Sequence, residues 1–181
     1  MPNLVKNIIL TDIKTAEKLL IKKEDMCYVD FNKLIKMPDH QPDLSKPNAF
    51  FAEGDLSFED QKRFGLNNWY DWSCNHWGTK WNAMTNNVLI DEKQNIAILD
   101  FDTAWCMPKP IFNALIKQSR TNIVWSYEEE EFDAEVYVVK IRKKDKQIMI
   151  DSQSLKDYKD IIDKYNITVQ EYEKNEMEAE V

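Results

Sequence analysis

Apolar residues recur along this chain in two spacings, which predict a mixture of strands and helices. Short apolar or alternating runs are typical of strands, and they occur at residues 4–10, 26–31, 88–90, 96–101, 122–128, 134–142 and 147–150. Helical spacing or a capping signal predicts helices at residues 13–20, 57–64, 111–119 and 154–165. Because hairpins outnumber strand–helix–strand units, the pattern favours an α+β fold, an antiparallel sheet with helices packed on one face.

Polar residues mark the expected starts of two helices. Thr11 or Asp12 is a good N-cap for the first helix. Ser57 stands three residues before Asp60, which is the spacing of a capping box, although Glu or Gln is usual at the second position. Residues 39–55 contain prolines and show little periodicity, which predicts a loop.

Residues 67–83 hold four of the six tryptophans, and the rest of the fold is expected to form around them. Trp69, Trp72 and His76 have the spacing of one helix face, and Gly78 suits the left-handed residue that ends a helix. A tryptophan ring buries roughly 150–250 Å². The favoured interpretation is therefore a packing nucleus, and the alternative is a ligand groove.

The alternative interpretation joins aromatic and polar residues of the same stretch. Lys80 lies between Trp77 and Trp81, so polar side chains nearby could converge on a small anion or a base above an aromatic floor. In the simpler case Thr79 and Asn82 close turns, and Lys80 covers a ring with its stem. The candidate ligand-binding residues are Trp69, Trp72, Asn75, Trp77, Thr79, Lys80, Trp81 and Asn82.

Length and charge limit the organisation and the partners. With 181 residues, we expect one domain over residues 1–168, including a tryptophan-rich helical insertion at about 56–83. Residues 169–181 are predicted to be an acidic, disordered tail. The net charge of -8 makes direct nucleic-acid binding an unfavoured function, because such binding depends on Lys and Arg. The three glycines cannot form a phosphate-binding glycine loop.

The cysteines indicate a reducing compartment and give only a weak metal signal. Their number is odd and no C-x-x-C spacing occurs, so a cytoplasmic location in a host cell is predicted, with no membrane span. Cys74 and His76, with Cys27, Cys106 and His40 elsewhere, could in principle form a zinc site. On a helix, Cys74 and His76 would point apart. We therefore predict neither a metal nor a cofactor.

A short motif at residues 99–103 is typical of one enzyme class. Asp100, Asp102 and Thr103 form the D-x-D-x-T pattern that follows an apolar strand in phosphatases of the haloacid dehalogenase class, where the first aspartate is the nucleophile and both help to hold magnesium. That class needs a parallel sheet, whereas the sequence here predicts hairpins. A motif counts only in its structural context, so this activity is the least favoured.

Several segments resemble one known family. They are Met-Pro-Asn at 1–3, Phe-Asn-Lys-Leu-Ile-Lys-Met-Pro at 31–38, Trp-Tyr-Asp-Trp at 69–72, Asn-His-Trp-Gly-Thr-Lys-Trp-Asn-Ala at 75–83 and Phe-Asp-Thr-Ala-Trp at 101–105. Over residues 1 to about 150 the chain resembles the YubB-like family of ferredoxin-like domains, uncharacterised proteins of phages, plasmids and integrated elements. The resemblance implies a ferredoxin-like fold and a mobile-element origin, and no established activity.

Two positions depart from the family pattern. His76 stands where members usually have asparagine, and Cys106-Met107-Pro108 stands where a Ser-Pro usually follows Ala-Trp. These departures concern details of a pocket rather than the fold.

An acidic run between two predicted strands offers a second candidate surface. Such runs are usually solvated loops. Carboxylates spaced along a rigid edge can also imitate phosphates and occupy a basic groove of a host enzyme. The candidate partner-binding residues are Glu128, Glu129, Glu130 and Glu131, with Asp133 and Glu135 following.

Three functional hypotheses follow. The leading one is a non-enzymatic binding protein of a phage or plasmid, which acts on a host or mobile-element protein through its acidic surface, for example as a counter-defence factor. The alternative is a small-ligand or nucleotide-binding protein that uses the region from Trp69 to Asn82. The third is a magnesium-dependent phosphatase at Asp100 and Asp102.

Overall fold

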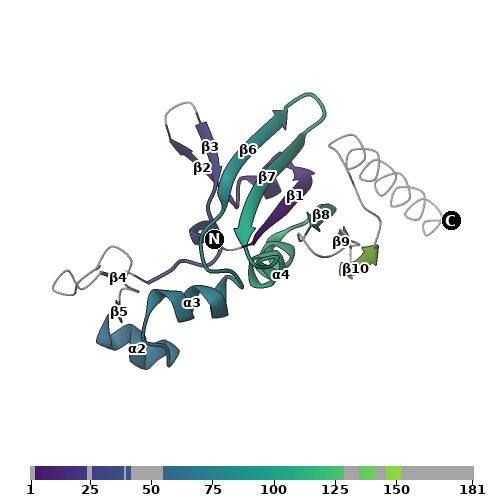
Figure 1. The fold of residues 1–181 in the computed structure, drawn as a ribbon. Coiled ribbons are helices and arrows are strands. Elements are labelled where there is room, and N and C mark those ends of the chain that lie inside the picture. The colour runs from purple at the N-terminus through teal and green to yellow at the C-terminus, as the bar shows by residue number, and fades with distance from the viewer. Residues whose placement is uncertain are drawn as a thin grey trace.

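A six-stranded antiparallel sheet forms the centre of the molecule, with strand order β10-β9-β8-β1-β7-β6 (Figure 1). The structure is a computed structural model that describes residues 3–23, 26–38, 40–41, 55–128, 135–141 and 146–151. Its sheet strands are β1 Leu4–Asp12, β6 Met84–Asp91, β7 Ile96–Ala104, β8 Ile123–Glu128, β9 Glu135–Ile141 and β10 Lys146–Asp151. The predicted α+β class and antiparallel sheet are confirmed, and the ferredoxin-like arrangement stays a prediction.

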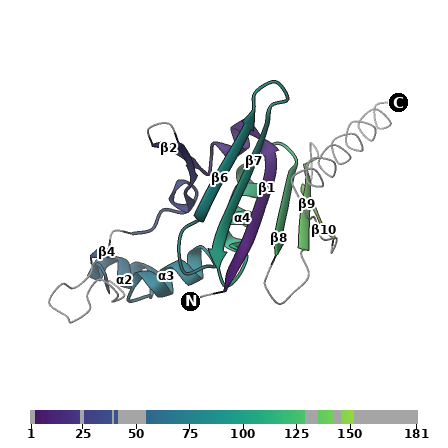
Figure 2. The ribbon, with the colours of Figure 1, turned by 45° about the horizontal axis from the view of Figure 1, so that its top comes forward.

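The remaining described elements are short helices and two small strand pairs. The helices are α1 Ile13–Ala16, α2 Phe58–Phe64, α3 Trp69–His76 and α4 Lys109–Gln118, with the 3-10 helix η1 at Phe31–Lys33. The strand pairs are β2 Leu20–Lys23 with β3 Met26–Val29, and β4 His40–Gln41 with β5 Asp55–Leu56. Helix α4 lies across the sheet, whereas α2 and α3 lie beyond one end of it (Figures 1 and 2).

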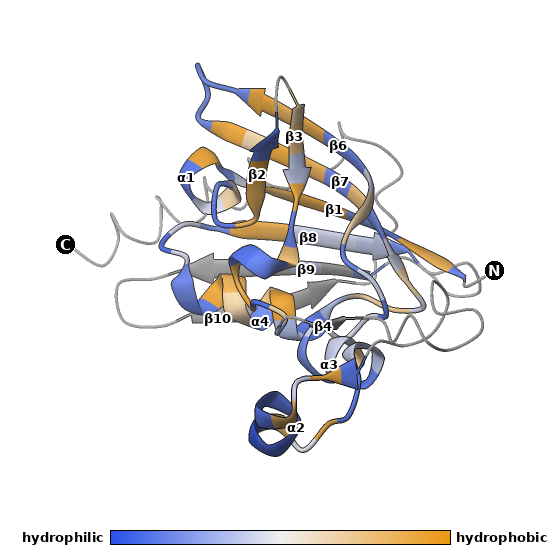
Figure 3. Cartoon of the chain, turned by 90° about the vertical axis from the view of Figure 1, so that its left-hand side faces the viewer, coloured by the Kyte–Doolittle hydropathy of each residue, from blue (hydrophilic) through white to orange (hydrophobic). Residues whose placement is uncertain are grey.

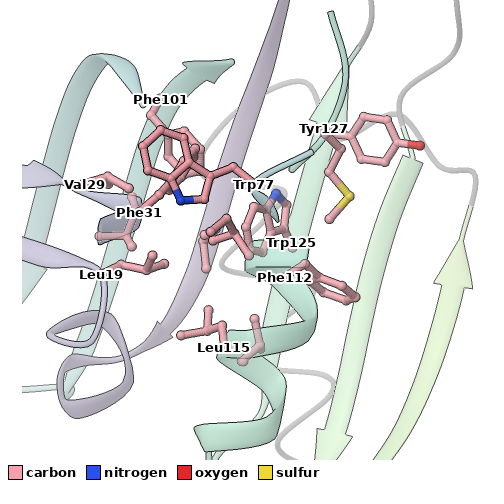
Figure 4. Packing of buried hydrophobic residues seen from close by; sticks show 14 of the residues in the cluster. Leu19, Val29, Phe31, Trp77, Phe101, Phe112, Leu115, Trp125 and Tyr127 are labelled. Atoms are coloured by element: carbon pink, nitrogen blue, oxygen red, sulfur yellow. The ribbon is translucent and has the colours of Figure 1, made fainter. Parts of the chain in front are cut away.

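Figure 3 shows apolar stretches along the central strands. Side chains from one face of these strands meet the rings of α4 and η1 in one core. On this face Trp125 of β8 contacts Phe112 of α4 at 5.4 Å between ring centroids, and Phe101 of β7 at 6.0 Å. The predicted apolar stripe of α4 is confirmed as buried: Ile111, Phe112, Leu115 and Ile116. Figure 4 shows Phe112 and Leu115 of α4 beside Trp125 in this core.

Helix α1 is much shorter than the sequence predicts. A helix was expected over residues 13–20, but α1 ends at Ala16, and Leu20 begins β2. The apolar spacing does report burial, since Leu19 and Leu20 are both buried. It does not report a helix, because residues 20–23 pair with 26–29 as a hairpin, and the Asp30 amide donates to the Leu19 carbonyl.

The predicted helix starts are confirmed where the structure describes them. The Asp12 carboxylate accepts from the Thr15 amide at 2.8 Å. Ser57 accepts from the Asp60 amide, and its hydroxyl donates to the Asp60 carboxylate at 2.7 Å. The predicted helix at 154–165, the tail at 169–181 and most of the predicted loop at 39–55 lie outside the described residues.

Gly78 ends α3 as predicted and also lies against the start of α4. Its φ is +79°, and its amide donates to the Ser73 carbonyl at 3.1 Å. A Cβ atom at this position would lie 2.7 Å from Cδ of Pro110. The residue therefore meets two demands together, a left-handed backbone and a close approach to a ring.

Replacing Gly78 with alanine should lower the free energy of unfolding by about 2–4 kcal/mol, because backbone strain and overpacking act together. Gly65→Ala is the matched control, since Gly65 also has a positive φ, +69°, but no atom lies within 4 Å of an added Cβ. Urea denaturation of both variants checks this. Equal losses for the two variants would show that the contact with Pro110 is not limiting.

Candidate functional site

Trp72 and Trp77 belong to the core, which confirms the packing-nucleus interpretation for these two residues. Their exposed fractions are 1% and 3%. Trp77 contacts the ring of Phe31 at 5.8 Å, and its indole nitrogen donates to the Ile35 carbonyl at 2.8 Å. Trp72 stacks on His76, with 4.4 Å between centroids. These tryptophans thus connect α3 and η1 to the sheet.

The polar candidates of the stretch mostly hold the backbone of the fold. The Thr79 hydroxyl donates to the Ala104 carbonyl and accepts from the Ala104 amide. Asn82 accepts from the Phe31 amide and donates to the Asp30 carboxylate at 2.7 Å. Asn75 is exposed and donates to the carbonyl of Asp71 within α3. Ligand binding by these residues stays a prediction.

Lys80 lies among aromatic rings from its own stretch of the chain and from the residue that follows β7. Its ammonium nitrogen is 5.0 Å from the ring centroid of Trp81, 5.2 Å from that of Tyr70 and 5.6 Å from that of Trp105. These distances are within the range of cation–π attraction. We call Lys80, Tyr70, Trp81 and Trp105 the Lys80 cluster. Trp69 extends it, because its ring lies edge-on to Tyr70 at 6.1 Å.

Trp105 is the most exposed member of the Lys80 cluster, and its backbone is strained. It directly follows β7, has a φ of +73° and is 43% exposed. Its amide donates to the Asn3 carbonyl at 2.9 Å. A bulky residue with this φ is uncommon, and such strain is concentrated at functional sites.

Neither Tyr70 nor Trp105 is among the ligand-binding residues that the sequence predicts. Tyr70 is adjacent to Trp69 in α3, so the density of aromatic residues in this stretch is a signal for it. Trp105 is separated from Lys80 by the whole β6–β7 hairpin. Its place in the cluster depends on tertiary structure, for which local spacing holds no signal.

Two of the residues considered for zinc, His76 and Cys106, are engaged in other contacts. Nδ1 of His76 is 3.0 Å from the Trp72 carbonyl oxygen, and the Cys106 thiol donates to the Gly78 carbonyl at 2.8 Å. Burial raises the pKa of the Cys74 thiol, which opposes the thiolate that zinc requires. Among the described residues, no three His, Cys, Asp or Glu side chains come together to hold a metal ion.

The D-x-D-x-T motif lies on a strand with antiparallel neighbours. Strand β7 runs antiparallel to both β1 and β6, so the parallel context of the phosphatase class is lacking around it. Asp100 forms an ion pair with Lys6 at 3.7 Å. The Thr103 hydroxyl is buried and donates to the Cys106 carbonyl. These contacts favour a structural role for the motif.

We expect the protein with Mg²⁺ to leave p-nitrophenyl phosphate unhydrolysed, because the motif is not at the end of a parallel strand. Release of p-nitrophenol measures this directly, and Asp100→Asn should have no effect on the background rate. Turnover by the wild type that disappears in a folded Asp100→Asn variant would restore the phosphatase hypothesis.

The structure describes only part of the acidic run. Glu128 is exposed at the end of β8, whereas Glu129, Glu130 and Glu131 lie outside the described residues. Glu135 faces two tyrosines: one of its carboxylate oxygens accepts from the Tyr127 hydroxyl at 2.7 Å and from the Tyr137 hydroxyl at 3.1 Å. The Glu135 carboxylate is therefore engaged by hydrogen bonds within the sheet. Partner binding by Glu128 and its neighbours stays a prediction.

These contacts predict an alkaline limit to stability. Burial and the hydrogen bond to Glu135 raise the pKa of Tyr127 above its ordinary value. In the unfolded chain tyrosine ionises near pH about 10. The contribution of Tyr127 to the free energy of unfolding is therefore fully present below that pH, and it falls above it by at most about 1.4 kcal/mol per pH unit.

Denaturant unfolding at about pH 9 and about pH 11 tests the effect. Tyr127→Phe should lose less stability between the two pH values than the wild type. Tyr28→Phe is the control, since the Tyr28 hydroxyl contacts the sulfur of Met26 and not a carboxylate. An identical loss in all three proteins would exclude Tyr127 as the cause.

Comparisons with protein-family models, with curated proteins and with solved structures found no match to this chain. Among the described residues, no helix has the length and apolar character needed to cross a membrane.

Proposed function

We propose that this protein is a non-enzymatic binding protein that recognises a small, flat, anionic ligand of the mononucleotide class at the Lys80 cluster. The observation that carries the proposal is the convergence of three rings on one ammonium group, at 5.0 to 5.6 Å. One of those rings belongs to Trp105, which is exposed and held at a positive φ. A cation beside aromatic surfaces is suited to a phosphate next to a base.

The chemistry of the two ligand parts matches the two kinds of group in the cluster. A nucleobase stacks on indole, which contributes about 1–3 kcal/mol per base in proteins that bind single strands. Lys80 supplies a point charge for phosphate. The net charge of -8 disfavours a long polyanion, so a single nucleotide is a better ligand than a nucleic acid.

The proposal includes a ferredoxin-like core. Counted among the central strands β1, β6, β7 and β8, the order β8-β1-β7-β6 is fourth, first, third, second, which is consistent with that fold's two split strand–helix–strand units. In this arrangement α4 is the second crossover helix. The first crossover is replaced by a long segment that includes α3. Tyr70, Lys80 and Trp81 of the Lys80 cluster lie in this segment.

Mobile-element origin remains part of the proposal through the YubB-like resemblance alone. Action on a host or mobile-element protein through the acidic surface is the other candidate function. It is favoured by the exposure of Glu128 at the end of a strand, and its decisive residues are Glu129, Glu130 and Glu131. Changing all four glutamates to glutamine in a pull-down would separate it from nucleotide binding.

Equilibrium dialysis with adenosine monophosphate tests the proposal. We expect saturable binding with a Kd on the order of 10–100 µM, typical of a small, partly open site. Lys80→Gln and Trp105→Gly should each weaken binding by about tenfold or more. Adenosine should bind more weakly than the nucleotide, because Lys80 then has no phosphate to contact.

Trp105→Gly is informative because glycine relieves the positive φ. It should leave the unfolding free energy within about 1 kcal/mol of the wild type, so loss of binding cannot be attributed to unfolding. Phe58→Ala is the control, since Phe58 is 82% exposed on α2 and outside the cluster. Absence of saturable binding by adenosine, guanosine, cytidine and uridine monophosphates, or equal binding by the variants, would refute the proposal.

A further inference from the structure

Strand β6 is one of the two edge strands of the six-stranded sheet. Its two halves differ in how well they are protected from pairing with a strand of another molecule. Among the described residues it pairs with β7 alone. In its first half the register shifts between Met84 and Asn87, Thr85 has a φ of +48°, and the Asn86 side chain accepts from the Val29 amide of β3. Bulges and covering segments of this kind prevent edge-to-edge pairing.

In the part of the chain that the structure describes, the second half of β6 has neither a bulge nor a covering segment. Val88, Leu89, Ile90 and Asp91 pair regularly with β7, and residues 84–91 include neither lysine nor proline. Leu89 and Ile90 are 46% and 43% exposed. Figure 2 shows this end of the β6–β7 hairpin extending past the neighbouring elements. An apolar edge of this kind is a template for another strand.

The sequence of this edge is complementary to itself in one antiparallel register. If a two-fold axis passes through Leu89, then Leu89 faces its own copy, Val88 faces Ile90 and Asn87 faces Asp91. No like charges face each other, and apolar residues meet on both sides of the sheet. An isologous contact between identical edges is the geometry of a two-fold dimer.

The surface beside Leu89 has room for an apolar side chain from a second copy. A hollow of about 180 Å³ is lined by Leu89, Ile90, Asp91, Gln94, Ile96 and Ile98. In the register above, the second copy's Leu89 lies next to this hollow. The contact would bury apolar surface as well as pair backbone groups.

We infer that the second half of β6 is a self-association edge, where two copies of this chain pair their β6 strands antiparallel about Leu89 into a continuous sheet. Because the interface is shorter than a standard one, the dimer is weak, with a Kd on the order of 10–200 µM. Each copy carries a net charge of -8, so added salt should strengthen the dimer by screening repulsion.

Sedimentation velocity across about 5–500 µM, at low and high salt, tests the inference on the full chain. The wild type should shift from monomer to dimer as concentration rises. Leu89→Lys should weaken the dimer by at least about tenfold, since two lysines would then face each other at the axis. Phe58→Lys introduces the same charge at a more exposed apolar position and should dimerise like the wild type.

Cross-linking tests the register. In a background with Cys27, Cys74 and Cys106 changed to serine and shown to be folded by circular dichroism, Leu89→Cys should form a disulfide dimer faster than Ile90→Cys. Directly opposed residues have Cα atoms about 4.5–5.5 Å apart, a separation that a disulfide accepts.

Three results would overturn the inference. A monomer at every concentration would do so, and would leave this edge to a strand of another protein. A dimer that survives Leu89→Lys would show that the contact lies elsewhere. Faster cross-linking through Ile90→Cys would exclude a two-fold axis at Leu89. Nucleotide binding at the Lys80 cluster is measured separately, so neither result decides the other.

Discussion

The structure depends on a continuous series of aromatic contacts that links α4, the sheet, η1 and the end of α3. The series runs from Phe112 of α4 to Trp125 and Phe101 of the sheet, then to Phe31 of η1, and finally to Trp77 after α3. Edge-to-face pairs of this kind stabilise a core by about 0.5–1.5 kcal/mol each beyond the area that they bury. Phe31 is the central contact, because it meets both the sheet and the tryptophan stretch.

The same arrangement explains why two kinds of tryptophan occur within a few residues. Trp72 and Trp77 face the core and are almost fully buried, whereas Trp69 and Trp81 are half-buried. A helix end followed by a turn presents successive residues in different directions, so a single stretch both anchors the fold and forms a surface. The packing nucleus and the proposed ligand site are therefore two sides of one segment.

The sequence predicts correctly the features that depend on residues close together in the chain. It does not predict the features that depend on a pairing partner elsewhere in the chain. The caps at Asp12 and Ser57, the stripe of α4 and the stop at Gly78 follow from the chemistry of residues close together in the chain. The β2–β3 hairpin was missed because Leu19 and Leu20 have helical spacing with Ile13 and Ala16, and only the pairing with residues 26–29 overrides it. The Lys80 cluster was half predicted, since Lys80 and Trp81 are adjacent in sequence and Trp105 is not.

Thr79 shows how a single side chain can take the place of a strand. Its hydroxyl makes the donor and acceptor contacts with Ala104 that a neighbouring residue in an antiparallel ladder would make through its backbone. The last residue of β7 is thus satisfied without a further strand beside it at that point. The strand can therefore end here, and Trp105 follows at once in a left-handed conformation, with its ring half in the Lys80 cluster and half in solvent.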